Sequence, residues 1–414
     1  MSKLKELIDR LCTDGVEYTT LGKVAEIKRG VRVVKNDLAL EGEIPVYQNS
    51  LTPLGFYSKS NFAADTAFVI GAGAAGEIGY SSIPYWGADD CYSIICSSNV
   101  ISKYVYYQLA NNQIFLKSRV RTASIPRLAR IAIEQFPIPV PPIEVQEEIV
   151  KILDHFADYA AELQAELQAR KEQYEYYRNL LLTFNPSACG CGTDGEQEMK
   201  VTVWGGASYE INWKTMGEIG KFFGGLTGKS KADFSNGNAR FISYMNVYSN
   251  IALNQSANEF VRILPNEKQN VLRYGDALFT GSSETPDECG MSSVVTTEPK
   301  EPLYLNSFSF GFRLDDSSIY HPDFLKHLLR SKSIRSQIAK TANGVTRFNI
   351  SKALFAKISL PIPPIELQLK IANILDRFET LVNDLTQGLP AEIAAVKEQY
   401  EYYRNKLLTF KKAS

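Results

Sequence analysis

The sequence has few of the residues that build disulfide scaffolds, metal centres and membrane spans. Its 414 residues include six cysteines in irregular positions and three histidines. No apolar run approaches the roughly 20 residues that a bilayer requires. Because the cysteines form no disulfide framework, we expect a reducing cytoplasm. Residues 1–18 have the pattern of a charged amphipathic segment, whereas a signal peptide has an apolar centre.

The sequence also lacks an excess of charge of either sign, since 45 Lys+Arg face 46 Asp+Glu. Uniform neutrality would argue against a polyanion ligand, but the charges are segregated along the chain. Residues 99–133 hold six basic side chains and no acid, residues 326–357 hold eight and no acid, and residues 143–184 hold nine acids against four bases. The basic residues are Lys103, Lys117, Arg119, Arg121, Arg127 and Arg130 in the first run, and Lys326, Arg330, Lys332, Arg335, Lys340, Arg347, Lys352 and Lys357 in the second.

Motifs of catalysis and metal binding are absent or incomplete. Gly71–Gly76 matches GxGxxG, but the residues after it favour a strand, so we expect a glycine-rich turn and no dinucleotide site. Cys189 and Cys191 lack the further ligands that zinc needs. No nucleophile elbow, P-loop or metal-binding histidine pair occurs, and the histidines form no recognisable cluster. The sequence predicts no catalytic residue and no metal site in this chain.

The strongest positive feature is an internal repeat. EQYEYYRNLLLTF at 172–184 and EQYEYYRNKLLTF at 398–410 agree at twelve of thirteen positions. The Pro-rich segment 137–146 is repeated at 361–368, and ILDHF at 152–156 is repeated as ILDRF. The chain therefore consists of two copies of one unit: a variable block, a Pro-rich hinge and a helical block.

The helical blocks have the apolar spacing of a coiled coil. Proline suits the first turn of a helix, so we expect one long helix over 143–184 and a second over 365–414, with a break near 388–390. The two helices are predicted to form an antiparallel coiled coil within the chain, although a generic dimerisation coil has the same pattern. The seam residues are Ile149, Ile152, Phe156, Tyr174 and Tyr177 in the first helix and Ile371, Ile374, Phe378, Tyr400 and Tyr403 in the second.

The variable blocks, within 1–142 and 211–364, are rich in short β-type runs and turn residues, which predicts two α+β modules joined by a linker at 185–210. Their landmarks correspond: IPVYQN at 44–49 parallels FISYMN at 241–246, and TASIPRL at 122–128 parallels TANGVTRF at 341–348. Everything between the landmarks differs. The same fold is therefore expected twice, with different surfaces.

Each basic run occupies the same place in its repeat, which favours a polyanion contact in which Lys and Arg neutralise phosphates. Neighbouring amides are of the type that reads base edges, although asparagine in a loop also serves as a turn residue. The candidate DNA-binding residues are Tyr47, Gln48, Asn49, Lys117, Arg119, Arg121, Arg127, Arg130, Tyr244, Asn246, Lys340, Asn343, Arg347 and Lys352.

The whole arrangement resembles the specificity (S) subunit of type I restriction–modification enzymes. The resemblance rests on the two PIPxPP-type hinges, the two Ile-Leu-Asp helices, the two EQYEYYRNxLLTF segments and GEIGY at 76–80. It implies two α+β target-recognition domains separated by an antiparallel coiled coil in a pseudo-twofold repeat. It also implies binding to double-stranded DNA, to two methylation (M) subunits and to restriction (R) subunits, with no membrane contact.

The resemblance further implies that this chain is not an enzyme and holds no cofactor. S-adenosylmethionine, ATP and Mg are expected only on partner subunits, and the NPP[FY] methyltransferase motif is absent because Asn185-Pro186 continues as Ser-Ala. Each module is expected to read one half of an asymmetric bipartite target, and the coiled coil to set the spacer. The alternatives are a coiled-coil scaffold with two protein- or glycan-binding modules, and a monofunctional methyltransferase or nuclease.

Overall fold

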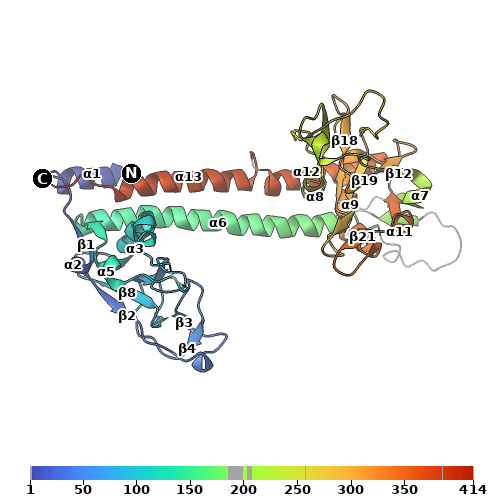
Figure 1. Cartoon of the computed structure of the whole chain (residues 1–414). Coiled ribbons are helices and arrows are strands. Elements are labelled where there is room, and N and C mark those ends of the chain that lie inside the picture. The colour runs from blue at the N-terminus through green and yellow to red at the C-terminus, as the bar shows by residue number, and fades with distance from the viewer. Residues whose placement is uncertain are drawn as a thin grey trace. The chain divides into compact units, whose positions relative to one another are not determined.

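The computed structural model describes residues 2–122, 124–184, 199–202, 208–256, 258–384 and 386–413. The chain forms two compact units, Met1–Ala165 with Glu392–Ser414, and Glu166–Ala391 (Figure 1). The division cuts through the long helices, so each unit contains helical segments from both copies of the repeat. Cys189 and Cys191 lie outside the described residues. Across the described part of the chain, every helix is too short or too polar to cross a membrane.

The first unit is an α+β module on which two helical segments pack. Its four-stranded sheet has the order β2-β8-β5-β6, and a smaller sheet has the order β4-β3-β7. The elements are α1 (Ser2–Leu11), β1 (Tyr18–Thr20), α2 (Leu21–Val24), β2 (Ala25–Arg29), β3 (Ile44–Tyr47), β4 (Gly55–Tyr57), β5 (Thr66–Ile70), β6 (Ile78–Ser81), β7 (Trp86–Gly87), β8 (Cys91–Cys96), α3 (Ser102–Asn111), α4 (Gln113–Lys117), α5 (Arg130–Glu134), β9 (Pro137–Pro139), part of α6 (Ile143–Leu181) and most of α13 (Leu389–Leu408).

The second unit repeats this topology. Its four-stranded sheet has the order β12-β19-β15-β17 and a smaller sheet has the order β14-β13-β18, with the same parallel and antiparallel pairs as in the first unit. Its helices are α7 (Met216–Ile219), α8 (Tyr244–Ser249), α9 (Pro322–Arg330), α10 (Lys332–Ala339), α11 (Lys352–Phe355) and α12 (Ile365–Asn383). Its strands are β10 (Met199–Thr202), β11 (Ser208–Thr215), β12 (Gly220–Gly224), β13 (Ala239–Ile242), β14 (Phe260–Val261), β15 (Ala277–Thr280), β16 (Ser282–Ser283), β17 (Ser292–Val294), β18 (Leu303–Leu305), β19 (Ser309–Leu314), β20 (Ala342–Asn343), β21 (Phe348–Ile350) and β22 (Ser359–Ile362). The prediction of one α+β fold present twice is confirmed.

A buried glutamine fixes the hinge of each unit. The Gln146 amide is fully buried; it donates to the carbonyl oxygens of Asn99 and Pro141 and accepts from the Ile101 backbone N–H. Gln368 makes the same three bonds at the other hinge. Each amide thus joins one hinge carbonyl oxygen, of Pro141 or Pro363, to two backbone groups at the start of α3 or α9, and it satisfies buried polar groups on both sides.

Each helical segment of one repeat copy packs against a helical segment of the other copy. In the first unit Phe156 of α6 stacks on Tyr403 of α13, with ring centroids 5.5 Å apart, and the Tyr159 hydroxyl donates to Glu392. Partner numbers fall as α6 numbers rise, so these segments are antiparallel. In the second unit Tyr177 of α6 stacks on Phe378 of α12, also at 5.5 Å. Each EQYEYYR segment therefore packs on the module of the other repeat copy.

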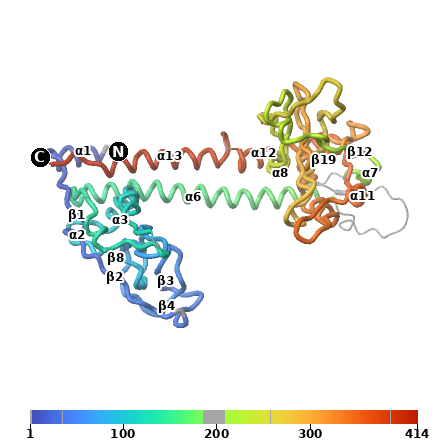
Figure 2. The backbone as a smooth tube through the Cα atoms, viewed as in Figure 1, coloured from blue at the N-terminus to red at the C-terminus, as the bar shows by residue number. Residues whose placement is uncertain are grey.

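The second long helix is interrupted between α12 and α13, at the position that the sequence marks with Gly388 and Pro390. A Cβ on Gly388 would lie 2.4 Å from the Thr380 carbonyl oxygen, so only glycine allows this close approach. At the chain end, Val16 pairs with Lys412, which places the C-terminal residues beside the start of the first module (Figure 2).

Candidate nucleic-acid interface

In the first module, several predicted residues meet at the turn between β5 and β6. Ala72 pairs with Arg127, and the Ala74 N–H donates to the Asn49 carbonyl oxygen. Gly73 has a φ of 79°, and a Cβ there would lie 2.9 Å from the Asn49 carbonyl oxygen, so this position requires glycine. The GxGxxG segment is followed by a strand, as expected for a turn between strands.

Two arginines beside this turn are available for a ligand. Arg121 and Arg127 lie opposite each other in a small hairpin and are exposed, and no described residue bonds to either guanidinium. Asn49 is also exposed, and Gln48 is half-buried. Residues about 75 positions apart in the sequence thus form one surface of donor groups, which fits the acceptors of phosphates and guanines.

Other predicted residues of this module have internal partners. Arg130 forms an ion pair with Glu134 at 2.6 Å, and the Arg119 guanidinium lies 3.4 Å from the centroid of the Phe115 ring. Lys117 lies 3.6 Å from Glu77. Tyr47 packs on Phe68 and Tyr85, and burial raises the pKa of its hydroxyl. The half-buried Tyr47 ring thus packs against a buried aromatic cluster, and its role as a base reader stays a prediction.

In the second module a cleft of about 690 Å³ lies beside the corresponding turn. Tyr244 begins helix α8 and donates its hydroxyl to the Ser282 carbonyl oxygen. Arg347 donates to the Ser282 hydroxyl at 3.0 and 3.2 Å. The structure therefore brings the predicted residues Tyr244 and Arg347 to one cleft.

The fold uses the side chain of Asn246, a predicted base reader, for internal hydrogen bonds. It is only 8% exposed, its amide donates to the Asn254 carbonyl oxygen, and its side-chain oxygen accepts from the Asn254 N–H. Lys340, Asn343 and Lys352 are exposed at their predicted positions. The Lys352 ammonium also lies 5.5 Å from the centroid of the Phe310 ring.

The second basic run contributes less free charge than its composition predicts. Arg330 donates to the carbonyl oxygens of Ser292, Val247 and Tyr248, and burial lowers its pKa to about 10. Arg335 donates to three further carbonyl oxygens, and Lys326 forms an ion pair with Asp376 at 2.8 Å. These three cations stabilise the fold, so the acid-free run overstates the surface charge.

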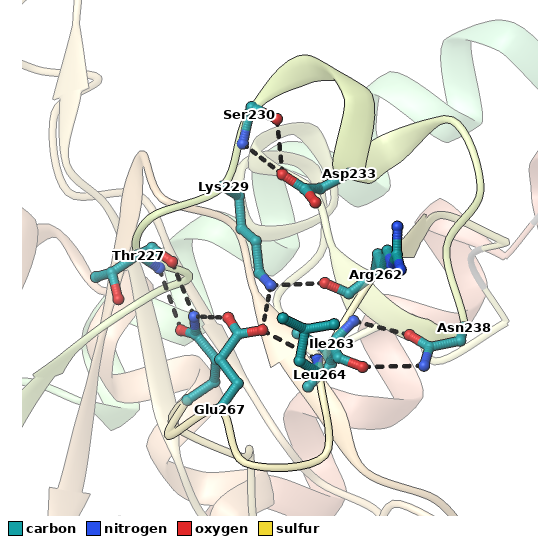
Figure 3. Close-up of polar contacts among 10 residues, drawn as sticks. Thr227, Lys229, Ser230, Asp233, Asn238, Arg262, Ile263, Leu264 and Glu267 are labelled. Carbon is teal, nitrogen blue, oxygen red and sulfur yellow. Dashed lines mark hydrogen bonds and ion pairs between the residues drawn. The ribbon is translucent and has the colours of Figure 1, made fainter.

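Figure 3 shows how a second set of loops in this module is held. Lys229 forms a 2.5 Å ion pair with Glu267 and donates to the Arg262 carbonyl oxygen, while the Asn238 amide bridges the N–H and carbonyl of Ile263. The hydrogen bond from Lys229 lowers the pKa of Glu267 to about 2. This network holds the loops on either side of β13 and β14 in one conformation.

A buried ionisable cluster lies between α9 and α12. His327 is fully buried and its Nε2 lies 2.7 Å from Asp376, while burial raises the pKa of Glu379 to about 7. Ligand atoms of these three residues lie within 4.8 Å of one another, which corrects the expectation that the histidines form no cluster. A metal would have to displace both Lys326 and the His327 hydrogen bond from Asp376. The donor set therefore fits an internal ion pair better than a metal site.

Two grooves flank the helical segments at equivalent positions of the repeat. The groove of the first unit has a volume of about 1180 Å³ and is lined by Val150, Asp154 and His155 of α6 and by Tyr403 of α13. The groove of the second unit, of about 520 Å³, is lined by the equivalent Ala372, Asp376 and Arg377 of α12. All ten predicted seam residues are buried or half-buried, and nine of them belong to the hydrophobic cores of the two units; the tenth, Phe156, stacks on Tyr403.

Comparison with known proteins identifies the family. The model of the type I restriction modification DNA specificity domain matches residues 13–172 and 210–395. The chain belongs to this family. It is 32% identical to the type I restriction enzyme EcoR124I/EcoR124II specificity subunit of Escherichia coli over 77% of this chain and 73% of that protein. It is 29% identical to a protein named as a type I restriction enzyme specificity subunit in Haemophilus influenzae, over 95% of this chain and 96% of that protein.

The fold agrees with this assignment. The crystal structure of the type I restriction–modification S subunit from M. genitalium matches 95% of this chain and 96% of that chain with a TM-score of 0.57 at 15% identity. A chain of another type I restriction–modification system matches 95% of this chain with a TM-score of 0.56. Membership in the specificity family confirms the prediction of a DNA-specificity subunit, the non-catalytic component of these enzymes.

Proposed function

We propose that each module of this specificity subunit reads one half of an asymmetric, bipartite DNA target. The observation that carries the proposal is the pair of modules with one sheet topology and different side chains around the turn after β5 and β15. Dimeric DNA readers place one framework on each of two half-sites. Here the frameworks are alike and the exposed residues differ, so the two half-sites should differ in sequence.

Methylation mapping tests this proposal directly. The full chain is co-expressed with its own methylation subunit in a host that lacks other methylation, and the methylated motif is determined by sequencing the genome. We expect two unlike half-sites separated by unread positions. A continuous motif, or one made of two identical halves, would contradict the proposal, and modification without sequence preference would do so as well.

We further propose that the helical segments set the length of the spacer. Insertion of four residues between Ala160 and Ala161 of α6, and of four between Ala394 and Ala395 of α13, adds one turn of about 6 Å to each helix. The rise of DNA is about 3.4 Å per base pair, so the preferred spacer should lengthen by one or two base pairs. A control with four alanine substitutions at exposed positions of the same segments should keep the original spacer.

The two equivalent grooves are proposed as the docking sites of two methylation subunits, because one partner fold can use the same position in each repeat. His155→Glu and Arg377→Glu should each remove one copy of the partner, and the double variant should remove both, as measured by native mass spectrometry. Glu162→Arg, on an exposed position of α6, is the control. S-adenosylmethionine, ATP and Mg on partner subunits, restriction subunits in the full complex and a cytoplasmic location remain predictions.

A non-DNA scaffold is the alternative function. The exposed arginine pair Arg121 and Arg127 favours DNA, because no described residue neutralises either side chain. Binding that depends steeply on salt supports DNA contacts. Retention of a protein or glycan ligand, with no salt-dependent retention on DNA, would support the scaffold.

A further inference from the structure

The turn after the central strand differs in length between the modules. In the first module the Ile70 N–H donates to the Glu77 carbonyl oxygen, which closes a turn of residues 71–76. In the second module the Thr280 N–H donates to the Met291 carbonyl oxygen, which closes a turn of residues 281–290. Both turns end in a glycine of positive φ, at 86° for Gly76 and 61° for Gly290. Because the ends of the two turns are equivalent, the second turn is longer by an insertion of four residues. We call the segment that contains it, residues 283–289, the inserted loop.

The inserted loop is held in place by buried donors. The Arg335 guanidinium donates to the carbonyl oxygens of Asp287, Cys289 and Gly290 at 2.5 to 2.7 Å, and burial lowers its pKa. The Cys289 thiol donates to the Phe348 carbonyl oxygen at 3.2 Å. Buried arginine bonds of this kind require a fixed backbone, so the loop presents its side chains in a defined geometry.

The loop has three carboxylates, of Glu284, Asp287 and Glu288, and the first and last of them line the cleft. Glu288 accepts from the Tyr248 hydroxyl at 3.0 Å and from the Thr285 hydroxyl at 2.9 Å. Glu284 is exposed, and it bonds to no residue that the structure describes. It lines the cleft of about 690 Å³ together with Tyr244, Met245, Ser282, Phe308 and Arg347.

Several large apolar side chains around the same cleft are exposed to solvent. Met245 is 59% exposed and Phe308 is 65% exposed, and both line it. Val345, which precedes the lining residue Thr346, is 91% exposed. Large apolar side chains gathered beside a polar cleft mark a binding surface. A carboxylate beside exposed apolar groups suits the pyrimidine edges of the major groove, where cytosine offers its N4 amine and thymine its methyl group.

We propose that the inserted loop is the specificity-determining element of the second module, and that Glu284 accepts a hydrogen bond from a cytosine amine while Met245 and Phe308 contact thymine methyl groups. The inference rests on the proposed function, since it names the bases that this module reads. Arg335 is the positioning residue that holds the loop. The first module lacks the insertion and presents Arg121 and Asn49 at the equivalent turn, so it should read its half-site through purine acceptors, with Arg127 as a phosphate contact beside them.

Methylation mapping of variants, co-expressed with the methylation subunit, tests the assignment with an internal control. Glu284→Gln should reduce the preference for G·C at one position of one half-site by about tenfold, since glutamine pairs with adenine. The spacer and the other half-site should stay unchanged. Glu298→Gln, at an exposed position of the same module, should leave the whole motif unchanged. Arg121→Ala should alter only the opposite half-site, which assigns each half to its module.

A second variant removes residues 284–287, which gives the turn the length that it has in the first module. We expect it to change the same half-site as Glu284→Gln. If both variants keep the original motif, the inferred role of the loop is wrong, although the bipartite function stands. Changes that spread over both half-sites would equally overturn the inference, because they would reflect a general effect on folding. A wild-type chain that yields no bipartite motif contradicts the proposed function itself.

Discussion

In the first unit the Asp154 carboxylate accepts from the Tyr107 hydroxyl and pairs with Lys103 at 3.1 Å. In the second unit Asp376 occupies the same place in the repeat, but its partners are His327 and Lys326. Each carboxylate pairs with a lysine, whereas its other partner is a tyrosine hydroxyl in the first unit and a histidine in the second. The hinge glutamines and the stacked aromatic pairs, by contrast, match in residue type and in distance. The contacts that fix the helices are thus duplicated, while the chemistry next to them has diverged.

The two modules likewise share their framework and differ in the surface that is proposed to contact DNA. The strand order of the central sheets is common to both units, and so is the glycine that ends each turn. The length of the turn, the short helix α8 and the distribution of free cations differ. Sequence change in such a protein is tolerated where it alters the target and costs stability where it alters the hinge. Substitutions at matched positions measure this difference.

The hinge glutamines should show the largest and most nearly equal effects. Gln146→Leu and Gln368→Leu each leave one buried N–H and two carbonyl oxygens without a partner, which should cost about 4 kcal/mol. Hydrogen exchange read by mass spectrometry reports each unit separately. Gln168→Leu, at an exposed position of α6, should change stability by less than about 0.5 kcal/mol. An effect in only one unit would contradict the equivalence of the hinges.

The buried carboxyl of Glu379 should make only the second unit sensitive to pH in the neutral range. Burial raises its pKa from 4.5 to about 7; the nearby charges of Asp376 and Asp323 add to the rise, and those of Lys326 and Arg330 oppose it. The folded state then binds more protons than the unfolded state between these values, so stability should fall by about 3 kcal/mol as pH rises through this range. Exchange protection measured at pH 5 and pH 8 should show the loss in the wild type.

Glu379→Gln should remove that loss. His327 acts in the opposite direction, because burial lowers its pKa and stability therefore falls as pH drops below its ordinary value. The variant should keep this low-pH loss. The first unit has Ala157 at the equivalent position, and it should not share the loss between pH 5 and pH 8. A parallel pH response of the two units would show that Glu379 is not its source.

The stacked aromatic pairs should give a smaller effect. Phe156→Leu and Phe378→Leu keep most of the buried apolar area but lose stacking on Tyr403 and Tyr177, which should cost about 1 kcal/mol each. Because the contacts cross between repeat copies, Phe156→Leu should weaken exchange protection of 398–410, and Phe378→Leu that of 172–184. Protection lost within the same repeat copy would contradict the crossed packing.

Much of the fold was predictable, because the repeat and the heptad spacing are visible in a single sequence. The crossed packing follows from the predicted antiparallel pairing of the two helices, although the nearly identical EQYEYYR segments alone do not show which module each one joins. The base-reading residues were predicted unevenly for a related reason. Tyr47 and Asn246 have the residue types of base readers, but only the tertiary structure shows that one lies in an aromatic cluster and the other bonds to Asn254.

The number of basic residues in a sequence run was the poorest guide to the charge exposed on the surface. The run 326–357 looks more basic than 99–133, yet Arg330 and Arg335 bind carbonyl oxygens and Lys326 binds Asp376. A backbone carbonyl oxygen that binds a cation cannot be recognised from residue types, whereas an acidic partner is visible in the sequence. The Gln at the end of each Pro-rich hinge is visible in the alignment of the two copies, but two of its three bonds go to backbone groups about 45 residues earlier, at the start of α3 or α9, and only the tertiary structure brings these groups together.

The smallest effect on stability, and the sharpest comparison within one module, is expected from two neighbouring arginines. Arg127 is exposed and bonds to no described side chain, whereas Arg130 is paired with Glu134 at 2.6 Å. If Arg127 contacts phosphate, Arg127→Ala should weaken DNA binding and reduce the slope of log K against log salt by about 1. Arg130→Ala should leave the slope unchanged, because its ion pair already neutralises the side chain. Each change should alter stability by less than about 0.5 kcal/mol, since both are at the surface. Equal slopes for the two variants would mean that total charge, and not the arrangement at the β5–β6 turn, governs binding.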